Sequence, residues 1–305
     1  MAGCGFDAAI APAAEIATAP PVPNGDPMRT LIHVGAHKTG TSLIQKYFRD
    51  RMSLPGELPV SFISRTDTNK LIGWGQHLVE HPDRLRSRLE TELTRSPKVF
   101  VSHENTLGHP FVDGKTSLYP DAQELTKALA SIAVDLDPCV VFYVRPMADY
   151  IESFYLQTVH QGACHSFEEW YATVDPGALR WQPIVDALDD TFGAERVVIG
   201  DFSTISAGQN EFLAHFMQRC GLPLPGTLDY RPVRNASVSA RGLEIALRIN
   251  PFLQNIKERR AARKFLQENF SNVTGERARP MPASVREDLD ARTSGEYRQL
   301  SERAR

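Results

Sequence analysis

The stretch Arg29–Phe48, which reads RTLIHVGAHKTGTSLIQKYF, decides the fold of this 305-residue chain. Thr30–Val34 is rich in β-branched and apolar residues and predicts a buried strand. The apolar residues of Thr41–Arg51 recur with helical spacing and predict a helix. A strand that ends in a glycine-rich turn and opens a helix presents free backbone N–H groups and a positive dipole end to an anion. The stretch therefore predicts a phosphate-binding loop.

The residue types of the expected loop agree with this role. Gly35 and Gly40 allow backbone conformations and close approach that a side chain would obstruct. Lys38 adds a mobile positive charge, and two hydroxyl residues open the helix. An ordinary strand–helix turn would explain the same short motif, so a second motif is needed. The residues expected to contact the phosphate group are Gly35, Ala36, His37, Lys38, Thr39, Gly40, Thr41 and Ser42.

The loop departs from the Walker A pattern of nucleoside triphosphatases. That pattern has glycine, four residues and then Gly-Lys-Ser/Thr, whereas Lys38 precedes Gly40 here. Asp201 is the nearest candidate for the acidic strand end that would hold Mg²⁺ in such enzymes. Hydrolysis of ATP or GTP is therefore disfavoured, and a P-loop kinase or NTPase is kept as an alternative.

A second polar motif lies in Val140–Gln157, VVFYVRPMADYIESFYLQ. Arg145 follows an apolar strand, and Ser153 stands eight residues later on the following helix. Ligands in open parallel sheets bind outside the carboxyl ends of the strands. The planar fork of an arginine matches a phosphate group there. Alternatively, Arg145 caps the sheet and Ser153 is an ordinary helix residue; for either residue alone both explanations stay open.

Composition describes an ordinary globular chain. Apolar residues make up 42% and charged residues 23%, and the net charge of −3 argues against a general nucleic-acid binder. No apolar run approaches the length of a membrane span. Residues 1–27 are rich in Ala and Pro and contain no Lys or Arg, so we expect a disordered extension rather than a secretory signal, and a cytoplasmic protein. Reduced, mostly buried thiols are expected at Cys4, Cys139, Cys164 and Cys220, which show no metal-binding spacing.

The remaining chain alternates apolar strands with helices. This order predicts the α/β class, a parallel sheet with helices on both faces, and a helical C-terminal third. One domain over residues 28–305 is expected. The predicted strands are Lys98–Ser102, Cys139–Val144 and Arg196–Phe202; the predicted helices are His81–Thr94, Asp121–Val134, Met147–Gln161, Phe167–Thr173, Leu179–Phe192, Gln209–Cys220 and the region from Ser239 onward.

Taken together, the two motifs resemble the superfamily of sulfotransferases that use 3′-phosphoadenosine-5′-phosphosulfate (PAPS). In that family a KTGTS-like loop, here Lys38–Ser42, receives the 5′-phosphosulfate. A strand–Arg–helix–Ser element, here Arg145 and Ser153, receives the 3′-phosphate, and the spacing of eight residues matches. The match is strong over the two motifs and weak between them. The stretches HVGAHKTGTS and FYVRPMADYIESFY look most like bacterial carbohydrate-type sulfotransferases.

The resemblance implies a P-loop-like sulfotransferase fold, PAPS as co-substrate, 3′,5′-ADP as product, and no required metal. It implies transfer of a sulfuryl group to an acceptor hydroxyl of a glycan or glycolipid. In members that act on sugars the base is usually a glutamate, and in those that act on small phenols and alcohols it is a histidine. Glu104 and His103 both follow a predicted strand, and Glu104 is the favoured base. Alternatively, Glu104 caps the next segment or pairs with a nearby arginine. Strand alternation would point the two side chains to opposite sides. Lys38 is expected to stabilise the leaving oxygen.

Two later segments are less informative. Arg231–Gly242, RPVRNASVSARG, stands where the family carries a basic loop over the 3′-phosphate, and its candidates are Arg234, Asn235, Ser237 and Arg241. Lys257–Lys264, KERRAARK, could attract an anionic glycan, but a solvated helix face is the favoured explanation. His33 is expected to be a packed strand residue. The acceptor and the oligomeric state are not specified by the sequence. Open alternatives are a sulfotransferase for small alcohols or phenols with His103 as base, and a degenerate nucleotide-binding module without catalysis.

Overall fold

The computed structural model describes residues 28–51, 59–224, 228–231 and 237–304. The Ala/Pro-rich extension 1–27 and the candidates Arg234 and Asn235 lie outside these ranges. The expectation of a single domain from residue 28 stays a prediction.

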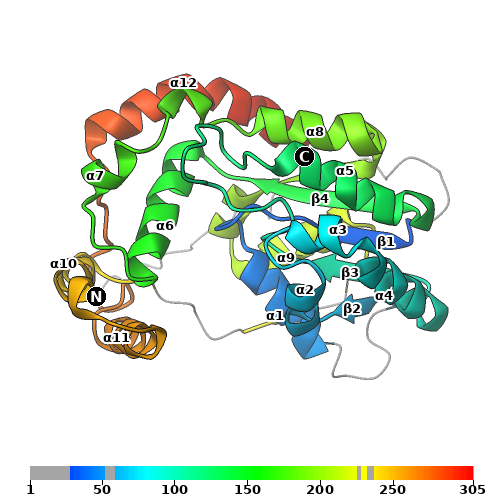
Figure 1. Ribbon diagram of the computed structural model, residues 1–305, viewed down its shortest axis with the longest axis horizontal. Coiled ribbons are helices and arrows are strands. Elements are labelled where there is room, and N and C mark those ends of the chain that lie inside the picture. Colours follow the sequence, from blue (N-terminus) through cyan, green and yellow to red (C-terminus); the bar gives the residue numbers. More distant parts are fainter. Residues whose placement is uncertain (1–27, 52–58, 225–227, 232–236, 305) are drawn as a thin grey trace, which may run out of the picture.

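The centre of the described chain is a five-stranded sheet (Figure 1). Its order is β2-β3-β1-β4-β5, and every neighbouring pair is parallel. The central strand β1 therefore lies between β3 and β4, and the segments that follow these three strands meet at one edge of the sheet. The strands are β1 (Thr30–His33), β2 (Ser61–Ile63), β3 (Val99–Ser102), β4 (Pro138–Val144) and β5 (Val197–Asp201).

Helices connect the strands and cover the sheet. The α-helices are α1 (Thr41–Arg51), α2 (Arg65–Leu71), α3 (Gln76–Glu80), α4 (Pro82–Arg95), α5 (Ala122–Ala133), α6 (Met147–His160), α7 (Phe167–Tyr171), α8 (Gln182–Phe192), α9 (Gln209–Arg219), α10 (Ala240–Ile249), α11 (Ile256–Asn269) and α12 (Ala283–Arg303). Short 3₁₀ helices occur at η1 (Val134–Leu136), η2 (Pro176–Ala178), η3 (Ala194–Arg196), η4 (Phe202–Ser206) and η5 (Asn250–Phe252).

Successive residues of each strand face opposite sides of the sheet, and both sides are apolar. On β4, Val140, Phe142 and Val144 pack with residues of α4, α5, α6 and α8. The alternate residues Val141 and Tyr143 pack with residues of α1 and α9. The α/β class, the parallel sheet with helices on both faces and the helical C-terminal region are thereby confirmed.

The sequence analysis did not predict the edge strand β2. The edge strand β2 has only three residues, and the short helices α2 and α3 that follow it were not predicted either. Short edge strands carry too few residues for a clear period, which explains the omission. Among the described residues, no helix is long and apolar enough to cross a membrane.

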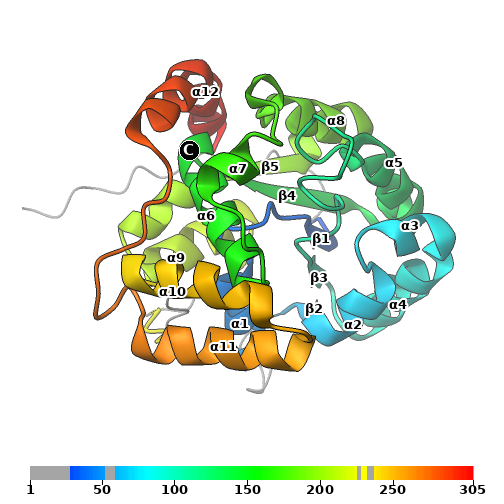
Figure 2. The ribbon, with the colours of Figure 1, turned by 60° about the vertical axis from the view of Figure 1, so that its left-hand side comes forward.

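The last third of the described chain forms two separate groups of helices outside the sheet, α10 with α11 and the single helix α12 (Figure 2). Helices α10 and α11 lie side by side, and α10 packs against α6. The long helix α12 packs along α6 and against β5. Both groups therefore contact the helix that follows β4, which is the helix that carries Ser153.

Candidate active site

The loop between β1 and α1 has an unusual backbone. Gly35, Lys38 and Gly40 have φ angles of 31°, 63° and 91°. Positive φ is uncommon for a non-glycine residue, and such strained conformations cluster at ligand-binding sites. The loop ends at Thr41, where α1 begins, and the first amides of a helix have no intrahelical acceptor. The geometry of an anion-binding helix start is therefore present.

Gly40 is required by its surroundings as well as by its φ angle. A side chain at this position would place its Cβ 2.5 Å from the ring of Phe212, which belongs to α9. Such a contact is too close for any real carbon pair, so only glycine lets the loop pass this ring.

Lys38 and Arg145 meet across the neighbouring strands β1 and β4. The Nη1 atom of Arg145 donates a 2.9 Å hydrogen bond to the backbone oxygen of Lys38. Burial and the guanidinium groups of Arg145 and Arg263 lower the pKa of Lys38 to about 8. No ion pair between Lys38 and a carboxylate exists among the described residues. Two cations without a shared counter-charge form a site for an anion.

The hydroxyls of the loop have different partners. Thr39 donates through Oγ1 to the backbone oxygen of Ala36 at 2.6 Å and so closes the loop on itself. The Oγ1 atom of Thr41 is buried and has no hydrogen-bond partner in the described structure. Ser42 is exposed at the first turn of α1. Buried polar atoms in native proteins are normally satisfied, so Thr41 is an open position for a ligand or water.

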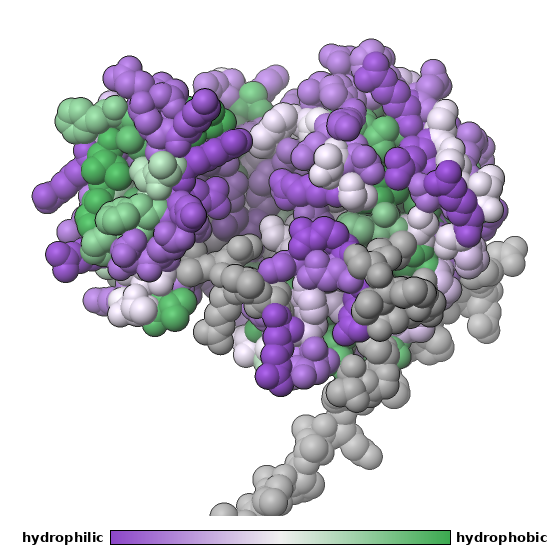
Figure 3. Space-filling view, turned by 90° about the horizontal axis from the view of Figure 1, so that it is seen from below, coloured by the Kyte–Doolittle hydropathy of each residue, from purple (hydrophilic) through white to green (hydrophobic). Residues whose placement is uncertain are grey.

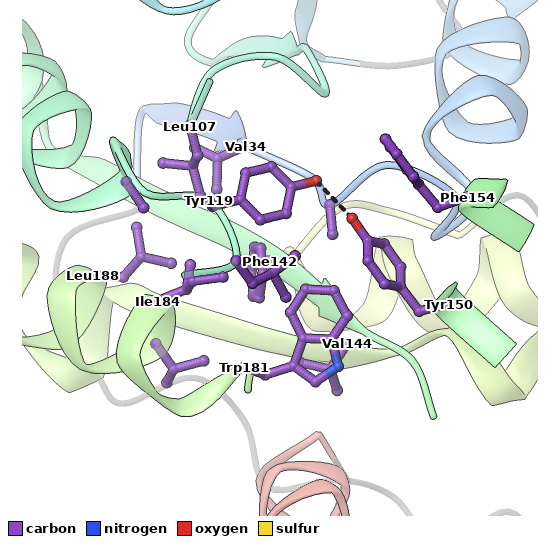
Figure 4. Packing of buried hydrophobic residues seen from close by; sticks show 14 of the residues in the cluster. Val34, Leu107, Tyr119, Phe142, Val144, Tyr150, Phe154, Trp181, Ile184 and Leu188 are labelled. Carbon is purple, nitrogen blue, oxygen red and sulfur yellow. Dashed lines mark hydrogen bonds between the residues drawn. The ribbon is translucent and has the colours of Figure 1, made fainter. Parts of the chain in front are cut away.

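His37 is fixed by Tyr119, a residue of the segment between β3 and α5. The backbone N–H of His37 donates to the Tyr119 hydroxyl at 2.8 Å, and its Nδ1 lies 2.8 Å from the same oxygen. Tyr150 of α6 donates to Tyr119 at 3.4 Å, the contact drawn dashed in Figure 4. Burial lowers the pKa of His37 to about 4, so its ring is neutral and accepts the Tyr119 proton. His37 therefore anchors the loop.

His33 is a packed residue, as expected. It is buried and its Nδ1 bonds to the Ser102 hydroxyl at 2.9 Å, which ties β1 to the end of β3. Burial lowers its pKa to about 4.

Glu104 is held by an ion pair. Its carboxylate contacts Arg65 of α2 and accepts a 3.3 Å hydrogen bond from Gln45 of α1. Burial would raise the pKa of Glu104, but the positive charge of Arg65, a backbone hydrogen bond and the nearby His103 and His37 together outweigh it, and the pKa lies below its ordinary value. Glu104 is therefore ionised at neutral pH, and its negative charge also reaches His37 in the loop.

His103 is fully buried, and both of its ring nitrogens have partners. Nε2 lies 2.8 Å from Oδ1 of Asn69, and Nδ1 accepts from the backbone N–H of Asn105 at 3.3 Å. Arg65 and Asn69 stand four residues apart on α2 and share one face, so Glu104 and His103 contact the same helix face. The expectation that they point to opposite sides is therefore wrong, because β3 ends at Ser102.

Two aromatic residues contact Arg145. Its guanidinium lies 5.0 Å from the ring centroid of Phe202, and Trp181 donates through Nε1 to its backbone oxygen at 2.8 Å. Figure 4 shows Trp181 packed beneath Tyr150 and beside Val144, the last residue of β4. Glu296 of α12 in turn accepts from the backbone N–H of Trp181 at 2.6 Å. These contacts hold both the side chain and the backbone of Arg145 in place.

Helix α6 is clamped to α12 next to Ser153. Arg286 bonds to Asp149 at 2.8 Å and to Glu152 at 3.0 Å. The side chain of Glu152 is 2% exposed, so this carboxylate depends on Arg286 for compensation. Ser153 is half-buried on the same helix. The clamp fixes the helix on which Ser153 stands.

The late segment is only partly described. The Ser237 N–H donates to Oδ1 of Asn272 at 3.0 Å, and Arg241 lies over the ring of Phe270. Arg277 pairs by an antiparallel bridge with Ser239. Burial is the main cause that lowers the pKa of Arg145, and the positive charge of Arg277 lowers it further. Arg277 therefore belongs near the Arg145 end of the site, and no sequence signal indicated it.

Asp201 has structural partners. It accepts from the Tyr297 hydroxyl at 2.6 Å and from the Ser203 N–H at 2.8 Å. In the described part of the chain no group of three or more His, Cys, Asp or Glu side chains is arranged to hold a metal ion. Cys139, Cys164 and Cys220 are free thiols, and only Cys164 is exposed.

The chain was compared with family models, curated proteins and solved structures. No family model and no curated protein matches the chain. Among solved structures, it is similar to a sulfotransferase from Alicyclobacillus acidocaldarius, with a TM-score of 0.46 and 15% sequence identity. The match covers 77% of this chain and 96% of that one.

Proposed function

We propose that this chain is a PAPS-dependent sulfotransferase that acts on a hydroxyl of a glycan or glycolipid. The observation that carries the proposal is the meeting of Lys38 and Arg145 at the ends of adjacent parallel strands, beside a helix start. The two sequence motifs that resemble the sulfotransferase superfamily are the same two elements. An anion with two phosphate-type groups fits this pair of cations.

The residues of the loop fit a phosphosulfate. Thr41 offers a buried hydroxyl without a partner, and Gly40 keeps the loop backbone free of a side chain. We assign the 5′-phosphosulfate to the loop from Gly35 to Ser42. We assign the 3′-phosphate to Arg145, Ser153 and the late segment that includes Ser237 and, outside the described residues, Arg234 and Asn235.

PAPS, when bound, supplies the sulfuryl group. In the proposed step the acceptor oxygen forms a bond to sulfur, the bond between sulfur and the 5′-phosphate oxygen breaks, and the hydroxyl proton passes to Glu104. Lys38 stabilises the negative charge on the leaving oxygen. Glu104 is ionised because of Arg65, which is the state a base needs before transfer. His103 is less suited, since both ring nitrogens already have partners.

Thermal unfolding with added ligands tests the nucleotide. We expect 3′,5′-ADP to raise the unfolding temperature and ATP·Mg²⁺ to raise it much less. An equal or larger effect of ATP·Mg²⁺ would contradict the proposal and favour a kinase or NTPase. Radiolabelled PAPS offered with a panel of glycans, glycolipids, phenols and alcohols tests the acceptor. Label found only on phenols or alcohols would reject the glycan assignment but keep the transferase.

A further inference from the structure

Helix α11 carries five basic residues in the stretch Lys257–Lys264, which sequence analysis assigned to a solvated face. These five side chains are exposed in the structure, as a solvated face requires, but one of them also contacts α6. A side chain at Gly162 would place its Cβ 2.9 Å from Cδ of Arg259, so Arg259 lies against the turn that ends α6. Gly162 can accept this contact because it has no side chain and a φ angle of 111°.

Arg263 stands four residues after Arg259, so it continues the same face of α11. Its positive charge acts on two groups, Lys38 in the loop and His160 at the end of α6. Among the described residues Arg263 forms no ion pair, whereas the adjacent Lys264 pairs with Glu268 at 3.8 Å. Arg263 is thus an exposed cation without an ion-pair partner, close enough to Lys38 and His160 to act on both.

His160 of α6 is affected by the charges of both Arg263 and Lys38. It follows Ser153 by seven residues, which is two turns, so both lie on one face of α6. Its Nε2 atom is buried and has no hydrogen-bond partner in the described structure. Burial and the charges of Arg263 and Lys38 lower its pKa to about 4, so the ring is neutral. A neutral imidazole with its proton on Nε2 can donate one hydrogen bond to an anion.

A surface recess lies next to the lobe that contains α11, the helix of Arg263. Seen from below, a recess lined by hydrophilic residues separates the lobe of α10 and α11 from the rest of the molecule (Figure 3). Leaving a buried polar atom unsatisfied is costly, and a ligand in such a recess would remove that cost at His160.

We propose that Arg263 of α11 and His160 of α6 bind an oxyanion of the ligand that Lys38 also contacts. Helix α11 then lines the binding site with an exposed basic side chain. This inference rests on the proposed function, which brings an anionic ligand to Lys38. The oxyanion is either a phosphate group of the co-substrate or a sulfate or carboxylate group of an anionic glycan acceptor.

Calorimetric titration of full-length protein tests Arg263. The variants Arg263→Gln and Lys264→Gln each remove one positive charge from neighbouring positions of α11, but only the first faces the site. We expect Arg263→Gln to weaken 3′,5′-ADP binding by roughly ten- to hundredfold, as for loss of a charged hydrogen bond, and Lys264→Gln to change it less than about twofold.

A second titration separates the two sources of the oxyanion. If Arg263→Gln leaves 3′,5′-ADP binding unchanged but weakens binding of a heparin tetrasaccharide, relative to Lys264→Gln, the oxyanion belongs to the acceptor. Equal behaviour of the two variants with both ligands would overturn the proposal while leaving the transferase assignment intact. Wild-type protein that binds no 3′,5′-ADP would contradict both.

His160→Phe adds a readout that a purely structural histidine would not give. The variant removes the unsatisfied Nε2 atom and keeps a planar ring. We expect the unfolding temperature of the unliganded protein to stay the same or rise, while the affinity for the ligand that responds to Arg263→Gln falls by roughly tenfold. A lower unfolding temperature with unchanged affinity would assign His160 to packing and reject its binding role.

Discussion

The guanidinium of Arg145 is hydrogen-bonded to the backbone oxygen of Lys38 over 2.9 Å, which joins the segments that follow β4 and β1. The bond uses one of the five N–H donors of the arginine. In the proposed function the other donors bind phosphate, so that one side chain would both shape the loop and contact the ligand.

Loss of Arg145 should weaken nucleotide binding. We expect Arg145→Ala to reduce 3′,5′-ADP affinity by roughly ten- to hundredfold because a charge-assisted contact and the bond to Lys38 are both lost. The 3′,5′-ADP affinity of Arg145→Lys should lie between those of the wild type and Arg145→Ala, since lysine keeps the charge and loses the planar fork. Calorimetry with Arg84→Ala, an exposed residue of α4, as the control measures this. Wild-type affinity in Arg145→Ala would reject its phosphate role.

Glu104→Gln should nearly abolish sulfuryl transfer and leave 3′,5′-ADP affinity close to that of the wild type. The amide keeps the shape and the contact with Gln45 but cannot take a proton at neutral pH. Turnover with labelled PAPS and calorimetry give the two measurements. If His103→Ala shows this pattern and Glu104→Gln does not, the base is His103.

The Arg65–Glu104 ion pair should affect how the reaction rate depends on pH. Arg65 holds the pKa of Glu104 below its ordinary value, so Arg65→Gln should raise it. The base must be ionised, and the acid limb of the kcat/KM profile should therefore move to higher pH. An acid limb at the same pH in both proteins would show that Glu104 does not limit the reaction.

Lys38 should make nucleotide binding pH-dependent. Its pKa is about 8 in the unliganded protein, and only the protonated amine attracts the anion. Affinity for 3′,5′-ADP should therefore be level from pH 7.5 to about 8 and fall above it. Lys38→Arg should remove the fall because arginine stays charged. For folding the sign is opposite: the unfolded chain keeps this proton up to its ordinary value of 10.5, so the unliganded protein gains stability above about pH 8.

Gly40→Ala should destabilise the protein through two effects that a second variant separates. Gly114→Ala also introduces a side chain at positive φ, 76°, but nothing lies within 4 Å of its Cβ. We expect about 1–2 kcal/mol from backbone strain in either variant. The clash with Phe212 should add about 1–3 kcal/mol in Gly40→Ala only. Denaturant unfolding measures both; equal losses would show that the Phe212 ring moves aside.

Local patterns predicted the sheet and its loop because they depend on neighbouring residues. The run from Pro138 to Val144 is apolar throughout and is buried throughout in β4. Arg145 and the loop around Lys38 follow their strands directly, so the edge of a parallel sheet brings them together.

The rest depended on contacts between distant segments. Tyr119 reaches His37 over 82 positions, and Arg286 reaches Glu152 over 134. Hydrophobic periodicity and motif spacing do not indicate contacts between residues so far apart in the sequence. Helical spacing from Ser153 would have indicated His160, and the basic stretch contained Arg263, but only packing of α11 at the end of α6 gives these residues a direction.

The contacts of α12 limit how the protein can be shortened. A truncated version ending at Met281 would lack Arg286 and leave the Glu152 carboxylate without its partner. It would also remove Glu296 from the first amides of α8 and loosen Trp181 under Arg145. A minimal engineered domain therefore has to keep the final helix, or replace Glu152 with an apolar residue and supply a new cap for α8.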